Sequence, residues 1–199
     1  MRRSMRCAIF LFPCKPEGGG VKFLSILVVC LFAAFPALAD GKYEMNLGST
    51  ALNKGEFAAA VEHLSAALES GQLYGEATAV VHISRAQAHY HLEEYQPAVD
   101  DLTVAIESGA INDTIVGIAL ATRASAYRKM GDWARALADF DAAIALGTIN
   151  AKMYFPRGLP LEADGQRARA IEDFRRAYDM APDNDAFRDK LLELGEAVD

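Results

Sequence analysis

One stripe of apolar residues occurs four times along the chain. Its clearest copy spans 136–144, where apolar residues stand at positions i, i+1, i+4, i+7 and i+8. This spacing places them on one side of an α-helix. The other copies open at Ala60, Ala98 and Ala170, so the intervals are 38, 38 and 34 residues. Because a single helical copy has no core of its own, and small Ala residues let a neighbouring helix approach closely, we expect the copies to stack.

The N-terminal residues differ in composition from the repeats. An apolar run of 13 residues, 23–35, follows Lys22 and precedes the small residues of 36–39. This charged, apolar and small-residue order is typical of a secretory signal, and the run is short for a transmembrane helix. We therefore expect a signal peptide over 21–39, cleavage after Ala39, and a mature protein that is periplasmic or secreted. An uncleaved membrane anchor is the less favoured alternative.

Residues 1–20 fit neither the signal nor the repeats. They contain Pro13, Pro16 and three successive glycines directly before Val21. We interpret this segment as a disordered upstream extension and Val21 as the true translation start, read from a GTG codon. A start at Met1 is the alternative.

Charge and cysteine content narrow the class of protein. All three cysteines precede residue 40, so the mature chain has no disulfide and depends on its apolar core. Residues 1–39 hold five of the 20 Lys and Arg residues but one of the 27 Asp and Glu residues, which leaves the mature chain a formal net charge of −11. This charge argues against nucleic acid and anionic membranes as partners, and it permits basic partners or none. After cleavage we expect no stable membrane insertion.

A second set of positions accompanies the stripes. Two copies read Gly131-Asp132-Trp133-Ala134-Arg135-Ala136-Leu137 and Gly165-Gln166-Arg167-Ala168-Arg169-Ala170-Ile171, and the last repeat closes with Pro182. A Gly, an aromatic two residues later and the Ala-lined stripe resemble the tetratricopeptide repeat, here in an exported bacterial protein. The resemblance covers about residues 44–184, with repeats at about 44–74, 79–112, 117–150 and 151–184. It implies an all-α, right-handed superhelical solenoid of four antiparallel helix pairs with a concave peptide-binding face.

Each repeat is expected to contain a first helix, a short turn and the striped second helix. The first helices are predicted at residues 43–52, 76–91, 114–130 and 151–163. Gly71, Gly109 and Gly147 stand just after the second helices, where a left-handed glycine commonly closes a helix. Residues 185–199 are predicted to form a capping helix over the last repeat.

The fourth repeat departs from the others at three positions. Pro156 and Pro160 fall inside its first helix, where proline removes a backbone donor and clashes with the preceding turn. A kinked helix and a delayed start are both open outcomes. Arg167 stands at the aromatic position, so we expect this end of the array to pack more loosely.

The first helices also repeat a charged position. In repeats two to four an Arg is followed sixteen residues later by an Asp, giving the pairs Arg85 and Asp101, Arg123 and Asp139, and Arg157 and Asp173. In the first repeat Leu47 and His63 take these positions, so both charges are lost together. We expect three internal ion pairs with planar, bidentate geometry across the hairpins. Coincidental surface charge is the alternative.

The resemblance implies that the first helices line the concave face. Carrying its groove positions over to this chain gives Ile83, Gln87, Tyr90, Ala121, Ser125, Arg128, Phe155 and Leu159. This mixture of side chains suits an extended peptide or a partner helix, and packing between repeats is the alternative for each residue. One subclass of the family binds chaperone C-terminal carboxylates through Lys and Asn. That activity is not implied, because those positions are Met45, Ser49, Ser84 and Ile118.

The sequence contains no constellation that predicts catalysis or cofactor binding. His82 and His89 share a helical face, but a metal site needs three or four ligands. No Gly-x-Ser-x-Gly elbow, phosphate-binding glycine loop or His-Glu-x-x-His motif is present. We therefore predict a non-catalytic scaffold that binds a protein or peptide, without metal or cofactor. The alternatives are a self-associating array that forms a homodimer and, ranked lowest, an enzyme or metal-binding protein around His82 and His89.

Overall fold

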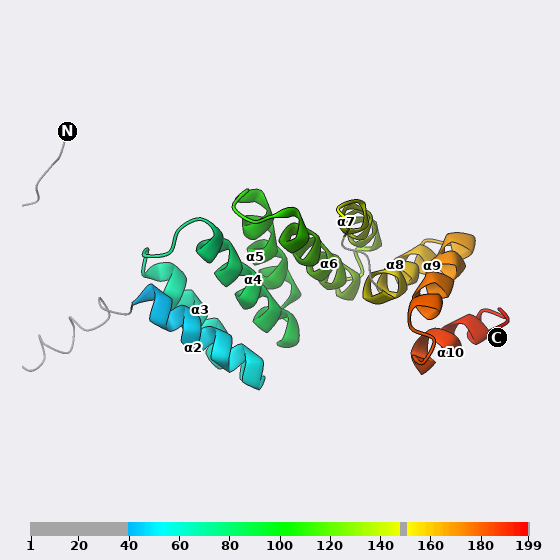
Figure 1. The fold of residues 1–199 in the computed structure, drawn as a ribbon, viewed down its shortest axis with the longest axis horizontal. Helices are drawn as coiled ribbons and strands as arrows, with labels where there is room; N and C mark the ends of the chain where they lie inside the picture. Colours follow the sequence, from blue (N-terminus) through cyan, green and yellow to red (C-terminus); the bar gives the residue numbers. More distant parts are fainter. Residues whose placement is uncertain (1–39, 148–150, 199) are drawn as a thin grey trace, which may run out of the picture. The chain divides into compact units, whose positions relative to one another are not determined.

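The computed structural model describes residues 40–147 and 151–198. Within these ranges the chain is all-α, with nine helices that form four sequential hairpins and one final helix (Figure 1). This arrangement confirms the predicted array of four hairpins and a cap. None of the helices in the described ranges is long and apolar enough to cross a membrane. The expected upstream extension, signal peptide and cleavage site at residues 1–39 lie outside the described residues.

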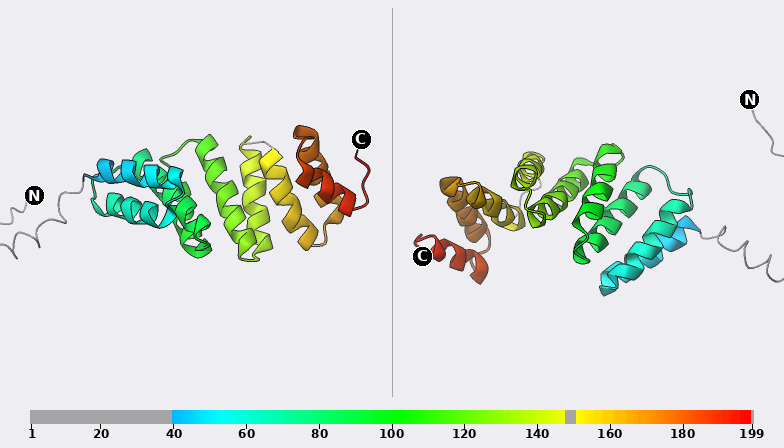
Figure 2. Two further views of the ribbon diagram at one scale, coloured as in Figure 1. Left: turned by 90° about the horizontal axis from the view of Figure 1, so that it is seen from below. Right: turned by 180° about the vertical axis from the view of Figure 1, so that it is seen from behind.

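Each hairpin pairs a first helix with a striped second helix. The pairs are α2 (Gly41–Lys54) with α3 (Phe57–Glu69), α4 (Glu76–His91) with α5 (Tyr95–Glu107), α6 (Asp113–Lys129) with α7 (Trp133–Ala145), and α8 (Ala151–Ala163) with α9 (Arg167–Met180). The capping helix is α10 (Asp185–Glu193). The predicted ends of the first helices differ from these by at most two residues. Successive hairpins pack in sequence order (Figure 2), and the first helices of neighbouring repeats also touch one another.

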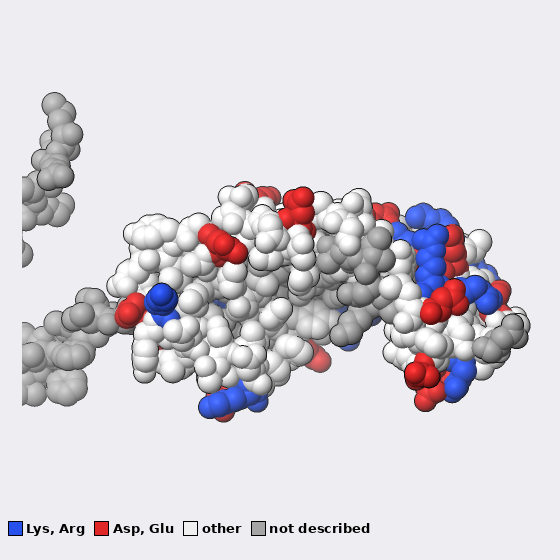
Figure 3. Space-filling view, viewed as in Figure 1, with Lys and Arg blue, Asp and Glu red and all other residues white. Residues whose placement is uncertain are grey.

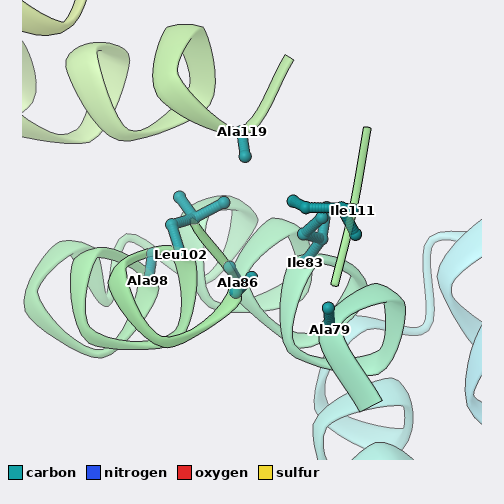
Figure 4. Packing of buried hydrophobic residues seen from close by; sticks show 8 residues of the cluster. Ala79, Ile83, Ala86, Ala98, Leu102, Ile111 and Ala119 are labelled. Atoms are coloured by element: carbon teal, nitrogen blue, oxygen red, sulfur yellow. The ribbon is translucent and has the colours of Figure 1, made fainter. Parts of the chain in front are cut away.

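The four stripes form the core of the array. Three residues of each stripe expose at most 1% of their surface: Ala60, Leu64, Ala67, Ala98, Leu102, Ala105, Ala136, Phe140, Ala143, Ala170, Phe174 and Ala177. Burying the large central residue of each stripe contributes about 1.5–3 kcal/mol. The stripes also join neighbouring hairpins, because Ala119 of α6 points toward Leu102 of α5 in the second repeat (Figure 4).

Small residues on the first helices allow this close packing. A Cβ atom added to Gly48 of α2 would lie 2.5 Å from Cγ of Leu64, and one added to Gly158 of α8 would overlap the ring of Phe174. The same position holds Ala86 in α4. In the first and fourth hairpins the first helix therefore lies so close to its partner that a Cβ would force the neighbouring side chain to move, whereas the second hairpin accommodates Ala at this position.

The helix ends follow the predicted glycine pattern, with one exception. Gly71, Gly109 and Gly147 have φ angles of 64°, 62° and 76°, as expected for left-handed closures. Inside the second hairpin, Glu93 takes a φ of 63° at the position that Gly131 holds in the third. A side chain in this region is strained, since its Cβ approaches the following carbonyl oxygen.

The fourth repeat excludes one of its two open outcomes and differs from one expectation. Helix α8 begins at Ala151 and continues through Pro156 and Pro160, so its start is not delayed. The expected looser packing is also not seen, because α10 covers this end and leaves Leu161 and Leu191 fully buried. Arg167, which replaces the aromatic, instead donates from Nη2 to the carbonyl of Leu194 at 2.7 Å.

Candidate functional site

A repeating ion-pair network holds each hairpin together. Three arginines of the first helices donate from Nε and Nη2 to both oxygens of an aspartate on the second helix. The distances are 2.8 and 2.7 Å for Arg85 and Asp101, 2.7 and 2.9 Å for Arg123 and Asp139, and 2.6 and 2.6 Å for Arg157 and Asp173. The pairs expected from the sixteen-residue spacing are therefore present, with bidentate geometry.

The same arginines also reach the preceding hairpin, which the sequence reasoning did not anticipate. Nη1 of Arg85 donates to Ser65 Oγ at 2.9 Å, and Nη1 of Arg123 donates to Thr103 Oγ1 at 2.9 Å. Nη1 of Arg157 donates to an oxygen of Asp141 at 2.7 Å. These three acceptors could have been found in the sequence, because each stands two residues after the aspartate position of its repeat. Each arginine thus ties three successive helices together.

The ion pairs shift the proton affinities of their members. Burial raises the pKa of Asp101, but hydrogen bonds from Arg85 and His82 outweigh it and hold that pKa below its ordinary value. Hydrogen bonds to aspartate raise the pKa of Arg85 and Arg123 despite desolvation. These arginines stay charged in the seam between the helices.

The network changes its chemistry at both ends. In the first repeat, His63 Nδ1 lies 2.7 Å from Glu44 Oε2. This pair replaces the missing Arg and Asp, with the acidic residue on the first helix and the basic residue on the second. After the fourth repeat, Arg175 donates to Glu196 Oε2 at 2.6 Å in the C-terminal tail. Charged side chains of both signs gather over α9 and α10 (Figure 3). Ion pairs between neighbouring elements therefore occur from the first hairpin to the tail.

A hollow of about 350 Å³ opens along the first helices α4, α6 and α8. Its lining residues are Tyr90, Ile118, Ala121, Thr122, Ser125, Phe140 and Met153. Four of them lie on one side of α6, spaced i, i+3, i+4 and i+7. Phe140 and Met153 are buried beneath the opening, whereas Ile118 leaves 44% of its surface exposed. Of the predicted groove residues, Tyr90, Ala121 and Ser125 line this hollow.

The other predicted groove residues lie elsewhere. Ile83 is a core residue with 8% exposure that packs with Ile111 (Figure 4). Phe155 and Leu159 pack in the C-terminal core, and the Phe155 ring stacks on Phe187 of α10 at 4.7 Å. These three side chains serve packing between repeats, because the next first helix, or α10, covers them.

Gln87 and Arg128 are half-buried and do not line the hollow. Ile118, Thr122, Phe140 and Met153 were missed as lining residues. Counting three and four residues from Ala121 and Ser125 along the helix would have found the first two. The sequence identifies Phe140 only as a core residue of the stripe. Its contact with the hollow could not be predicted, because it depends on how α7 packs under α6.

The histidines do not converge on one site. His82 Nδ1 lies 2.8 Å from Asp101 Oδ1, beside a second hollow of about 310 Å³ that also contains Ser108. His89 pairs separately with Glu94 Oε2 at 2.6 Å. Among the described residues, no three His, Cys, Asp or Glu side chains are grouped to hold a metal ion. Both oxygens of Asp101 accept from Arg85, so this carboxylate is a structural acceptor rather than a free base.

Comparisons with known proteins place this architecture. The tetratricopeptide repeat family model matches residues 45–110 and 122–185. A search of curated proteins found no match for the chain. The chain is similar in structure to residues 41 to the end of MamA from Desulfovibrio magneticus RS-1, with 19% identity, a TM-score of 0.65, and coverage of 76% of this chain and 81% of that one.

Two further structures show the same fold. A crystal structure of MamA has 22% identity and a TM-score of 0.63, and the alignment covers 78% of this chain and 85% of that one. The first repeat domain of Spaghetti (RPAP3), bound to the HSP90 peptide SRMEEVD, has 25% identity and a TM-score of 0.54, with coverage of 59% and 90%. The chain belongs to the tetratricopeptide repeat family, whose members are typically non-catalytic scaffolds for binding proteins or peptides.

Proposed function

We propose that this protein is a non-catalytic scaffold that holds a segment of a partner protein in the groove of α4, α6 and α8. The observation that carries the proposal is the hollow of about 350 Å³, to which three successive first helices contribute side chains. Packed helices are spaced about 8–10 Å apart and an extended chain advances about 3.3 Å per residue, so a segment of about six residues crosses three such helices.

The chemistry of the hollow suits such a segment. Ile118 is open to an incoming apolar side chain, and Phe140 and Met153 form an apolar floor. The Tyr90 ring is held by an edge contact with Tyr95 at 5.6 Å. Rigid aromatic and apolar anchors of this kind supply most of the binding energy in protein interfaces.

The groove is tested by site-specific crosslinking in cells that make the protein. A photoreactive phenylalanine at Ile118 should form adducts with a partner, whereas the same group at Ala138, exposed on α7, should not. Ala121→Trp, which fills the hollow, should abolish the adducts formed from Ile118. Equal crosslinking from both positions would contradict binding in the groove.

We also propose that the protein acts in the bacterial envelope after cleavage following Ala39. The residues that start α2 support this, because they lie after the cut. Asp40 Oδ1 accepts from the Lys42 amide at 3.0 Å, and the Asp40 carbonyl accepts from the Glu44 amide at 3.0 Å. A chain that begins at Asp40 keeps this N-cap. Intact-mass analysis of protein from the periplasmic fraction should give a chain starting at Asp40; a cytoplasmic protein of full mass would refute export.

Self-association is a second candidate function, favoured by apolar side chains exposed near the C-terminal end. Leu192 of α10 leaves 52% of its surface exposed and Met180 of α9 leaves 50%. A homodimer formed through α10 would bury Leu192. Sedimentation equilibrium at increasing protein concentration distinguishes the two functions, because a scaffold for another protein keeps the mass of one chain. A dimer mass that Leu192→Glu returns to the monomer would support self-association.

A further inference from the structure

We infer that the second hollow, beside Tyr74, is a docking site that takes an arginine side chain from a basic segment of a partner protein. This hollow has a volume of about 310 Å³ and is lined by the loop before α4, the start of α4 and the end of α5. It shares no lining residue with the hollow of the groove. The inference therefore goes beyond the proposed function, and the two can fail separately.

The loop before α4 presents an aromatic side chain to solvent. Tyr74 leaves 79% of its surface exposed, more than any other large hydrophobic side chain in the described ranges. Glycines with positive φ angles stand at both ends of this loop, with 64° at Gly71 and 59° at Gly75. The loop is also tied to the first hairpin, because the Gly41 amide donates to Gln72 Oε1 at 3.3 Å. Tyr74 is thus displayed by a loop that is fixed to the array.

The repeat architecture does not account for the residues around this hollow. Stripe and ion-pair residues recur from repeat to repeat, because each hairpin needs them. The second repeat has Tyr74, His82 and Val104 where the third has Asn112, Leu120 and Ala142. Val104 also leaves 49% of its surface exposed, so burial in the core does not explain it. An exposed aromatic and an exposed aliphatic residue at one hollow are typical of an interaction surface.

The hollow has room for one long side chain. Pockets for whole small molecules range from about 300 to 1,000 Å³, so this hollow is at their lower limit. Ala79 and Val104 offer apolar contacts to the methylene groups of such a side chain. The polar wall is fixed, since His82 Nδ1 lies 2.8 Å from Asp101 Oδ1. The site therefore suits an elongated side chain that enters beside the Tyr74 ring.

The part of the chain that carries the hollow is strongly acidic. Between Lys54 and Arg123 there are ten Asp and Glu residues and one basic residue, Arg85, so this stretch has a formal net charge of −9. Arg85 donates to both oxygens of Asp101 and is not free to neutralise other carboxylates. Most of the charge of −11 after residue 39 thus lies in this stretch, and it attracts cationic partners.

Two exposed carboxylates flank the hollow itself. Glu76 and Glu107 are chain neighbours of lining residues, one at the start of α4 and one at the end of α5. Neither carboxylate forms an ion pair or hydrogen bond within the described ranges, and the lining contains no Lys or Arg. Arginine is the cation that fits best, because its planar guanidinium stacks on an aromatic ring and donates several hydrogen bonds at once.

The arginine comes from another protein rather than from a second copy of this chain. Each exposed arginine in the described ranges is already bonded to an oxygen of its own chain: Arg135, Arg167, Arg169, Arg176 and Arg188. Placing one of them in the hollow of a second copy would exchange one pair for another. A free polyamine would meet the same carboxylates, but it has no planar group to stack on Tyr74.

Two peptide pools test the site on the full-length protein by fluorescence anisotropy. Both contain labelled eight-residue peptides with random Ala, Ser or Leu at alternate positions; the other positions are Arg in one pool and citrulline, its uncharged isostere, in the other. We expect the Arg pool to bind at least about tenfold more tightly. This preference should shrink between about 50 and about 300 mM NaCl, because salt screens exposed charges. Equal binding of both pools, or no binding of either, would overturn the inference.

Matched charge variants distinguish the hollow from the net charge of the chain. Glu76→Gln combined with Glu107→Gln should weaken binding of the Arg pool at least about fivefold, since both carboxylates flank the hollow. Glu56→Gln combined with Glu62→Gln removes the same charge from exposed positions near the start of α3. This control should weaken binding less than about twofold. Equal losses in the two double variants would reduce the effect to general attraction and overturn the site.

Variants of Tyr74 test the ring. Tyr74→Phe keeps the ring and should bind the Arg pool within about twofold of the natural protein, whereas Tyr74→Ala should bind at least about fivefold more weakly. Because Tyr74 is exposed, both variants should retain the helical circular dichroism signal and melting temperature. Full binding by Tyr74→Ala would overturn the inference.

The remaining outcomes separate this site from the groove and from other occupants. Ala121→Trp, which fills the groove hollow, should leave binding of the Arg pool unchanged; a loss there would place the basic segment in the groove and overturn a second site. Displacement of the Arg pool by spermidine at equal affinity would replace arginine recognition with general cation binding, and so would overturn it. A mass that rises with protein concentration, and returns to one chain in the Glu76 and Glu107 double variant, would make a second copy the occupant and also overturn it.

Discussion

Replacing Arg123 with Met tests whether the ion-pair network stabilises the array. Arg123 donates to both oxygens of Asp139 at 2.7 and 2.9 Å, and the two side chains expose only 16% and 12% of their surface. Losing one partner of a buried pair costs about 3–5 kcal/mol, because the other charge is left without compensation. Since the seam retains some exposure, we expect Arg123→Met to lower the free energy of unfolding by about 3 kcal/mol. In a domain of this size the melting temperature should fall by about 6–12 °C.

A double-mutant cycle shows whether the loss comes from the pair. Replacing both members, as Arg123→Met with Asp139→Leu, leaves no buried charge, and such replacements are often nearly neutral. The double variant should therefore be more stable than Arg123→Met alone, with a coupling of about 2 kcal/mol. The measurement is urea unfolding followed by far-UV circular dichroism. A single-variant loss below about 0.5 kcal/mol, or losses that simply add, would refute the reasoning.

Three further changes have defined outcomes. Glu93→Gly should stabilise the protein by about 0.5–1 kcal/mol by relieving a φ of 63°, and the reciprocal Gly131→Glu should destabilise it by a similar amount in thermal unfolding. Because the pKa of Asp101 is lowered in the folded state, its contribution to the free energy of unfolding is present at neutral pH and is lost as the pH falls below about 4. In unfolding measured at several pH values, Asp101→Asn should therefore lose less stability than the natural protein between neutral and acid pH. Arg128→Met should leave the free energy of unfolding unchanged or raise it by about 1 kcal/mol, since it removes a buried donor without an acceptor; a loss above about 1 kcal/mol would show a structural role.

The fold was predictable because every repeat carries the same local information. The Ala-lined stripe fixes a helix and its buried side, the glycines fix where helices end, and four copies in register fix the stacking. The sixteen-residue interval between Arg123 and Asp139 was informative for the same reason, because it recurs with each hairpin. Where the fourth repeat broke the pattern, inference failed: Arg167 was expected to loosen the packing, but it binds a backbone carbonyl of the tail.

The candidate groove was harder to predict because the same helical side serves two purposes. Tyr90 and Ser125 remain at the hollow, whereas Ile83 and Phe155, at related positions, are covered by the next element. Which of them stays open depends on how far the neighbouring first helix advances over it. That distance is set by tertiary packing and by the connection between repeats, neither of which a single repeat encodes. The missing partner of Arg128 was likewise invisible, because it is defined by the absence of an acceptor in space.

The ion-pair network and the groove use different sides of the same first helices. On α6, Arg123 points into the seam and links α5 with α7 through Thr103 and Asp139, while Ile118 and Ser125 face the hollow. The distance between neighbouring first helices, and so the width of the groove, is therefore set by residues outside the lining of the hollow. The exposed lining residue Ile118 can therefore change without disturbing the ion pairs, whereas the lining residue Phe140 also belongs to the core. The repeat pattern thus identifies the family, whereas the lining positions of α6 hold different residues in α4 and α2.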